Sequence, residues 1–134
     1  MKPRNGCEVL LLKAAEDEDV LDAALAGAKI SDEVFGFHAQ QAVEKLLKAR
    51  LISLNVDYPK VHNLLTMVEL LSARGDALPD ALADLFCLTP FATTFRYEEA
   101  EELILPDRAA LRARIAQLRD FVQRRLATSG SMMG

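Results

Sequence analysis

The sequence predicts an all-α protein, an antiparallel bundle of helices joined by short connections. Apolar residues recur at spacings of three and four through most of the chain. No segment alternates with the period of two that a half-buried β-strand shows, and no internal repeat has the spacing of a solenoid protein. The composition, 51% hydrophobic and 27% charged with six glycines and five prolines, is that of a folded chain rather than a disordered one.

The length and charge of the chain limit its class. Its 134 residues suit one hydrophobic core, and we expect residues 1–127 to form a single domain. A net charge of −4 argues against a protein that coats nucleic acid nonspecifically, because that task needs a large excess of Lys and Arg. Cys7 and Cys87 belong to no disulfide or zinc motif, so we expect reduced thiols in a cytoplasmic protein.

Neither a signal peptide nor a membrane-spanning segment is expected. The apolar run at residues 9–12 is bracketed by Glu8 and Lys13, and an acidic stretch follows at once. No window approaches the roughly 18 apolar residues of a transmembrane helix.

A first helix is predicted for residues 8–26. Its apolar residues recur at helical spacing and are interrupted by the charged run 16–19, which we expect to form one turn exposed to water. Gly27 follows as a C-cap candidate.

A second helix, residues 31–54, is predicted to be the central one. Ser31 is placed as its N-cap, and the charges of Asp32 and Glu33 suit the positive end of the helix dipole. Two apolar ridges run along it, so it should be the most buried helix, with neighbours on more than one side. The ridges consist of Phe35, Ala39, Ala42, Leu46 and Ala49, and of Val43, Leu47, Leu51 and Leu54.

A break at residues 55–60 separates this helix from a third. Asn55 can take a left-handed C-cap conformation, and Pro59 disfavours helix at the residue before it. The third helix is predicted for residues 61–73 and should end at Gly75.

A fourth helix is predicted for residues 78–88, with Pro79 in its first turn. Pro90 should kink or restart this helix, because it lacks the amide donor and its ring clashes with the preceding turn. Thr89 is the expected cap of the restarted segment.

The last helix follows Pro106 and Asp107 and has the most regular amphipathic pattern in the chain. Residues 128–134 are small and polar, so we expect a flexible C-terminal tail there. The apolar positions of the helix are Leu111, Ile115, Leu118, Val122 and Leu126.

Standard catalytic and cofactor motifs are absent from the sequence. No glycine-rich phosphate loop, Cys-x-x-Cys, His-Glu-x-x-His or Gly-x-Ser-x-Gly is present. With His38 and His62 as the only histidines, a histidine-based metal site would need carboxylates from elsewhere in the bundle. We therefore expect no metal and no cofactor.

A polar stripe on the predicted central helix is the first candidate site. His38, Gln41, Lys45 and Lys48 are spaced three, four and three apart, which aligns them on one helix face. An imidazole, an amide and two amines suit contacts to phosphates or bases. The alternative is that the lysines only solvate the helix, with Glu44 pairing to Lys48, while His38 and Gln41 bond to nearby backbone. Residue types alone favour the alternative.

A second candidate cluster is Lys60, His62 and Asn63, at the junction between a loop and the third helix. Exposed amide donors at such a junction favour an anion. The alternative is that His62 or Asn63 caps the helix.

A third candidate cluster, Arg96 and Tyr97, offers a guanidinium and a phenol after the Pro90 kink. Its alternative is that Arg96 pairs with the acidic residues 98–102 and that Tyr97 packs in the core.

Arginines are concentrated on the last predicted helix. They suit either a stripe for nucleic acid or pairing with solvent and with the acidic run of the first helix, and the second interpretation is favoured. They are Arg108, Arg112, Arg114, Arg119, Arg124 and Arg125.

Three of these segments resemble the HEPN family, the higher eukaryote and prokaryote nucleotide-binding domains. The segments are residues 37–48 with the core Gln-Gln-Ala-x-Glu-Lys-x-x-Lys, residues 60–64 with Lys-Val-His-Asn-Leu, and residues 94–97 with Thr-Phe-Arg-Tyr. They occur in the family's order and spacing, and the resemblance covers nearly the whole chain. It is closest to the small stand-alone prokaryotic type.

The resemblance implies an up-and-down bundle of four to five helices that commonly forms a homodimer. Small prokaryotic members are often encoded beside a minimal nucleotidyltransferase and form a toxin–antitoxin-like pair with it. Many members of the wider superfamily are metal-independent ribonucleases that use an Arg and a His about one to one and a half helical turns apart.

This chain departs from that ribonuclease pattern. No histidine follows Arg96, and His62 has no arginine at the required distance upstream, since Arg50 lies on the previous helix. The group that would take up the proton of a 2′-hydroxyl is therefore missing, and we assign no catalytic residue. We expect a non-catalytic nucleotide- or RNA-binding protein that partners a nucleotidyltransferase. The expected binding residues are His38, Gln41, Lys45, Lys48, Lys60, His62, Asn63, Arg96 and Tyr97.

Two alternatives stay open. One is a divergent ribonuclease toxin in which Arg96 works with His62, or with His38 of a dimer mate. The other is a structural dimerisation module whose interface joins the arginine-rich last helix to the acidic first helix.

Overall fold

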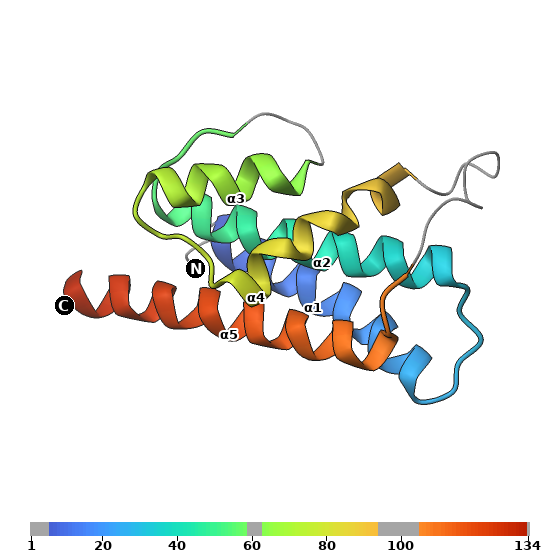
Figure 1. Cartoon of the computed structure of the whole chain (residues 1–134). Coiled ribbons are helices and arrows are strands. Elements are labelled where there is room, and N and C mark those ends of the chain that lie inside the picture. The colour runs from blue at the N-terminus through green and yellow to red at the C-terminus, as the bar shows by residue number, and fades with distance from the viewer. Residues whose placement is uncertain (1–5, 59–62, 94–104, 134) are drawn as a thin grey trace.

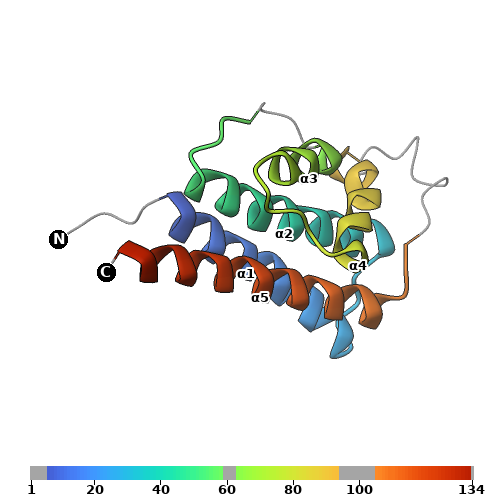
Figure 2. The same ribbon diagram turned by 60° about the vertical axis from the view of Figure 1, so that its left-hand side comes forward.

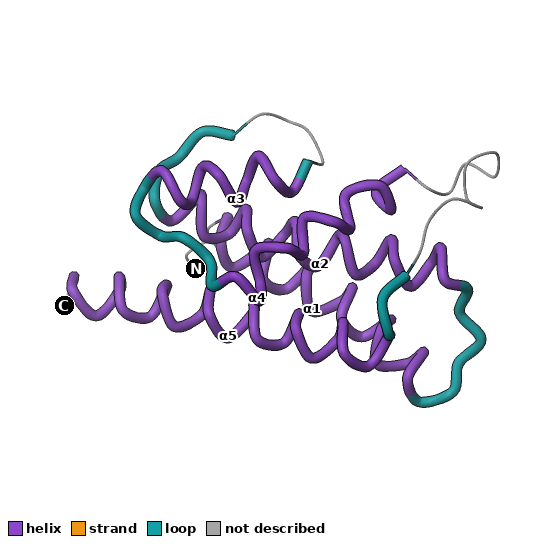
Figure 3. The backbone as a smooth tube through the Cα atoms, in the orientation of Figure 1, coloured by secondary structure: helices purple, strands orange, loops and turns teal. Residues whose placement is uncertain are grey.

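The structure, a computed structural model, describes residues 6–58, 63–93 and 105–133. Helices and connecting loops account for all of the described chain, and no strand is found within it (Figure 3). The all-α prediction is therefore confirmed. The elements are α1 (Gly6–Leu25), α2 (Asp32–Ser53), α3 (Leu64–Ala73), α4 (Asp80–Ala83), the 3-10 helix η1 (Asp84–Thr93) and α5 (Arg108–Met133).

The helices form a bundle around α2, which contacts α1, α3, η1 and α5. Figures 1 and 2 show α1 and α5 along one side of α2, with α3 and η1 on the other. Neighbouring long helices are antiparallel: Cys7 near the start of α1 bonds to Ala49 near the end of α2, whereas Asp17, further along α1, bonds to His38, nearer the start of α2. The predicted antiparallel bundle is the observed architecture.

The ends of α2 lie where the sequence predicts them. Ser31 Oγ accepts a hydrogen bond from the Val34 amide at 3.2 Å, which satisfies one of the unpaired donors of the first turn. After the helix, Asn55 has a φ of 58°, the left-handed conformation that ends a helix.

Both predicted ridges of α2 lie in the core, which confirms that α2 is the central buried helix. Phe35, Ala39, Ala42, Leu46 and Leu47 are each 0% exposed. They pack in one cluster with apolar residues of every other helix. Because α2 is surrounded in this way, the polar residues on its remaining face lie close to neighbouring helices.

The third and fourth helices differ from prediction. The predicted start of α3 at residue 61 is wrong, because Asn63 is its N-cap. Pro79 occupies the N-cap position of α4, one position before the helix begins, and not its first turn as predicted. The predicted restart of the helix at Pro90 is also wrong, because η1 continues through Pro90 to Thr93. A 3-10 helix has poorer hydrogen bonding than an α-helix, so the missing amide of a proline costs it less.

Thr89 does not cap a restarted helix. Its Oγ1 accepts a hydrogen bond from the Leu64 amide at 3.1 Å and donates one to the Phe86 carbonyl at 2.8 Å. It therefore joins η1 to the first turn of α3.

Helix α5 extends to Met133, beyond the last predicted apolar position. The backbone of residues 128–133 continues the helix, because no proline follows Pro106 and extending an existing helix is far easier than starting one. The flexibility of this end stays a prediction. None of the helices in the described ranges combines the length and apolar character that crossing a bilayer requires.

Candidate functional site

The polar stripe of α2 lies against α1. His38 Nδ1 is 2.8 Å from Asp17 Oδ1, and Lys45 Nζ donates to Asp17 Oδ2 at 2.5 Å. The Asp17 side chain is only 9% exposed, whereas those of His38 and Lys45 are 27% and 25% exposed. One buried carboxylate thus holds an imidazole and an ammonium at the edge of the α1–α2 contact.

The second half of the stripe is organised by Glu44. Lys48 Nζ donates to Glu44 Oε2 at 2.8 Å, and Gln40 Nε2 donates to Glu44 Oε1 at 2.9 Å. Gln41 Nε2 in turn donates to Gln40 Oε1 at 2.7 Å. The Glu44–Lys48 pair of the alternative interpretation is therefore confirmed. We call Asp17, His38, Gln40, Gln41, Glu44, Lys45 and Lys48 the α2 polar cluster.

The contact with Asp17 determines how His38 is presented. A carboxylate only accepts hydrogen bonds, so the shared proton is on Nδ1 of His38. In the neutral imidazole Nε2 then carries the lone pair and can accept a proton or a hydrogen bond. The cluster thus provides a base of fixed orientation with the Lys45 ammonium beside it.

The structure brings together only part of the predicted site. His38 and Lys45 meet at Asp17, and Gln41 and Lys48 are linked through Gln40 and Glu44. Lys60, His62, Arg96 and Tyr97, which the sequence analysis added to the site, lie outside the described residues.

Asn63 has a structural role. Its Oδ1 accepts hydrogen bonds from the amides of Leu65 at 3.0 Å and Thr66 at 3.3 Å. The capping alternative is confirmed for this residue.

Replacing Asn63 by alanine should lower the free energy of unfolding by about 1 kcal/mol, the typical cost of losing an N-cap. Urea denaturation followed by circular dichroism measures the change. Asn63→Asp keeps the acceptor oxygen and serves as the control. An alanine variant as stable as the wild type would show that the cap contributes nothing.

Arginines of α5 pair with acidic side chains instead of forming an unpaired basic stripe, and several of these pairs join α5 to other helices. Arg119 donates to Glu18 Oε2 through Nε at 2.9 Å and through Nη2 at 2.6 Å. Arg112 lies 3.3 Å from the other oxygen of Glu18 and also binds Asp22. Pairing with the acidic run of α1 is thus confirmed. Because these charges are paired within one chain, they no longer support an interface between two chains.

Asp17 and Gln40 are members of the α2 polar cluster that the sequence did not single out. Residues 16–19 were expected to face water, but Asp17 and Glu18 are only 6% and 4% exposed. The signal was present, since Asp17 follows the buried Ala14 by three positions and precedes the buried Leu21 by four. The expected wet turn is wrong for Asp17 and Glu18, because the cations that satisfy them come from other helices, α2 for Asp17 and α5 for Glu18. Glu16 and Asp19 are exposed, as expected.

Arg112 should make Asp22 a contributor to acid stability. Its hydrogen bond, 2.7 Å from Nε to Oδ1, lowers the pKa of Asp22 below the ordinary 3.8, and its charge adds to the effect. The stabilisation is present above pH 3.8 and is lost as the pH falls through the lowered pKa. Carboxyl NMR titration should give a pKa nearer 3.8 in Arg112→Gln; an unchanged pKa would contradict this cause.

No group of three or more His, Cys, Asp or Glu residues in the described chain is arranged to hold a metal ion.

Comparison with known proteins identifies the family. The family model of the HEPN domain matches residues 8–124, from the first turn of α1 to the outer half of α5. Searches of curated proteins and of solved structures found no significant match. The matched region contains the whole α2 polar cluster and spans most of the chain. This protein belongs to the HEPN domain family.

Proposed function

We propose that this protein binds a nucleotide or RNA at the α2 polar cluster and works as the partner of a minimal nucleotidyltransferase in a toxin–antitoxin-like pair. Membership of the HEPN family, a nucleotide- and RNA-related family of helical proteins, supports this function. We further propose that residues 1–127 act as one domain, as a homodimer, in the cytoplasm.

The contact of His38 and Lys45 with one buried carboxylate carries the proposal. The Lys45 ammonium has three donor hydrogens and can bind a phosphate while it keeps Asp17. His38 Nε2 and the Gln41 amide suit the edges of a base. Lys45 pairs with Asp17 and Lys48 with Glu44, which lowers the positive potential of the cluster. The cluster therefore suits a ligand with both a base and a phosphate better than a ligand that offers phosphates alone.

Calorimetric titration with ATP and with a short single-stranded RNA tests the binding. Lys45→Gln should weaken the affinity by about tenfold, the usual value of one charge-assisted hydrogen bond. Lys13→Gln, which removes an exposed charge from α1, is the matched control. Equal affinities of the Lys45 and Lys13 variants would refute a role for the cluster.

The partner is tested separately. The chain should co-purify with a nucleotidyltransferase encoded beside it when both are expressed together. If the two proteins are both folded but do not associate, the proposed partnership is excluded. The ligand-binding proposal is not affected by that result.

A divergent ribonuclease is the second candidate function. Asp17 bonds to Nδ1 of His38 and so orients the ring, which leaves Nε2 to accept a proton as a general base does. His38 of one protomer would then take the 2′-hydroxyl proton, with Arg96 of a dimer mate at the phosphate. Cleavage of a fluorogenic RNA should be lost in His38→Ala and persist in His62→Ala. An RNA that stays intact with the wild type, or cleavage that survives His38→Ala, excludes this function.

A further inference from the structure

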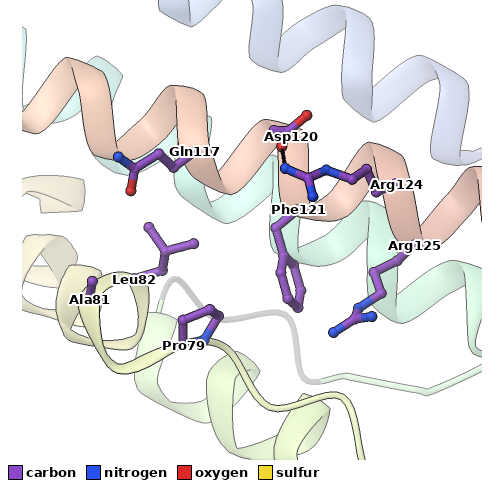
Figure 4. Close-up of a pocket in the computed structure, with 8 residues that line it drawn as sticks. All are labelled: Pro79, Ala81, Leu82, Gln117, Asp120, Phe121, Arg124 and Arg125. Carbon is purple, nitrogen blue, oxygen red and sulfur yellow. Dashed lines mark hydrogen bonds and ion pairs between the residues drawn. The ribbon is translucent and has the colours of Figure 1, made fainter.

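A pocket of about 370 Å³ lies between α4 and α5, and none of its lining residues belongs to the α2 polar cluster. The volume is within the usual range for small-molecule sites, which is about 300–1,000 Å³. Figure 4 shows Gln117, Asp120, Phe121, Arg124 and Arg125 on the α5 wall. The opposite wall consists of Pro79, Ala81 and Leu82.

Both walls of the pocket contribute apolar side chains to its lining. The ring of Phe121 points toward Pro79, and the side chain of Leu82 lies on the same side of the pocket (Figure 4). Leu82 is anchored in the core at 4% exposure, whereas Pro79 is exposed and Phe121 only partly buried. Such a surface favours a planar apolar group, because stacking on an aromatic ring adds to the burial of apolar area.

Arg125 lies beside the Phe121 ring and pairs with Asp76. Its guanidinium lies 4.5 Å from the centre of the Phe121 ring, and its Nε is 3.1 Å from Asp76 Oδ1. The other oxygen of Asp76 accepts from Arg50 Nε at 2.7 Å, and this buried pair anchors the carboxylate. A guanidinium has five N–H donors, so a group held through Nε can still bind an anion through its outer nitrogens.

Arg124 supplies a second guanidinium on the rim. Its side chain is 77% exposed and pairs with Asp120 one helical turn away. An exposed pair of this kind contributes little to stability, so an anion can replace Asp120 at small cost. Gln117 adds an amide that can donate or accept.

We propose that the α4–α5 pocket binds a small anion with a flat apolar body. The body lies on Pro79, Leu82 and Phe121, and the anionic group binds Arg124 and Arg125. A nucleoside monophosphate and an aromatic carboxylate share this chemistry. The site is separate from the α2 polar cluster and does not depend on its function.

Binding is tested by NMR titration of the full chain with AMP and with indole-3-acetate, with adenosine as the uncharged comparison. At least one of the two anions should shift the Arg124 and Arg125 Nε–H signals and the Gln117 side-chain amide. If AMP binds more tightly, the pocket is a nucleotide site. If indole-3-acetate binds more tightly, the pocket is a site for aromatic carboxylates. Adenosine that binds as tightly as AMP, or no saturable shift with either anion, would overturn the proposal.

Variants locate the ligand. The double variant Arg124→Gln/Arg125→Gln should lower the affinity for the preferred anion by about tenfold or more. Lys13→Gln/Lys29→Gln removes the same charge from exposed positions on α1 and the loop after it, and should leave the affinity within about twofold.

A third variant tests the apolar contact. Phe121→Leu keeps the burial but removes the ring, and should weaken binding by about two- to tenfold. Circular dichroism confirms that each variant is folded. An arginine variant that binds as well as its lysine control, or shifts confined to residues around His38, would contradict the assignment to this pocket.

Discussion

Alanine at position 36 is expected to destabilise the protein by about 1–3 kcal/mol, the usual cost of overpacking a core. A Cβ at Gly36 would lie 2.2 Å from Cδ1 and 2.4 Å from Cε1 of the Phe91 ring. Phe91 is 3% exposed and sits in η1, so its ring has little room to move. At an exposed position within a helix, replacing glycine by alanine would stabilise the protein by about 1 kcal/mol. A destabilising effect at position 36 would therefore itself indicate the contact with Phe91.

A double-mutant cycle measured by urea denaturation isolates the contact. Phe91→Ala alone should cost about 3–5 kcal/mol, the usual loss for a truncated buried phenylalanine. In that background Gly36→Ala should be neutral or stabilising, because the ring it would strike is gone. If Gly36→Ala destabilises equally with and without the ring, the close approach of η1 to α2 is not the cause.

Glu18→Ala is expected to lower the free energy of unfolding by about 3 kcal/mol, because it leaves two cations without their buried partner. The Glu18 side chain is 5% exposed and binds both Arg112 and Arg119. The value is at the low end for a broken buried pair because the two arginines remain 20% and 21% exposed and can regain some water.

Asp120→Asn provides the matched control for Glu18. It removes a carboxylate from an arginine pair on α5 whose members are 77% and 55% exposed, and should cause no measurable loss. The effect of Glu18→Ala should also persist at high salt, since buried pairs are screened less than exposed ones. Equal effects of the two variants would mean that burial does not strengthen the Glu18 contacts.

Much of the fold was predictable because local rules decide where helices begin and end. Ser31 caps α2, Asn55 takes the left-handed conformation after it, and the two apolar ridges between them are buried. Glycine and side-chain caps act over three or four residues, so they can be recognised without a neighbour in space. The same rules failed at Pro90, where η1 continues as a 3-10 helix and contacts α2 and α3.

The candidate site was predictable only in its α2 half. The spacing of His38, Gln41, Lys45 and Lys48 places them on one face, but it does not say what that face meets. Asp17 is 21 and 28 positions away from the two residues it binds. Charged residues are mostly exposed in proteins, so a charged run on α1 predicts exposure unless its partners are known.

The sequence by itself determined the all-α class, the central place of α2 and the alignment of its polar stripe, since periodicity and caps depend on neighbours along the chain. Only the tertiary structure decided that Asp17 and Glu18 are buried, and that His38 and Lys45 share one carboxylate. Burying a charge is favourable only beside a partner, and the partners of α1 are supplied by α2 and α5, which reach it only when the bundle folds.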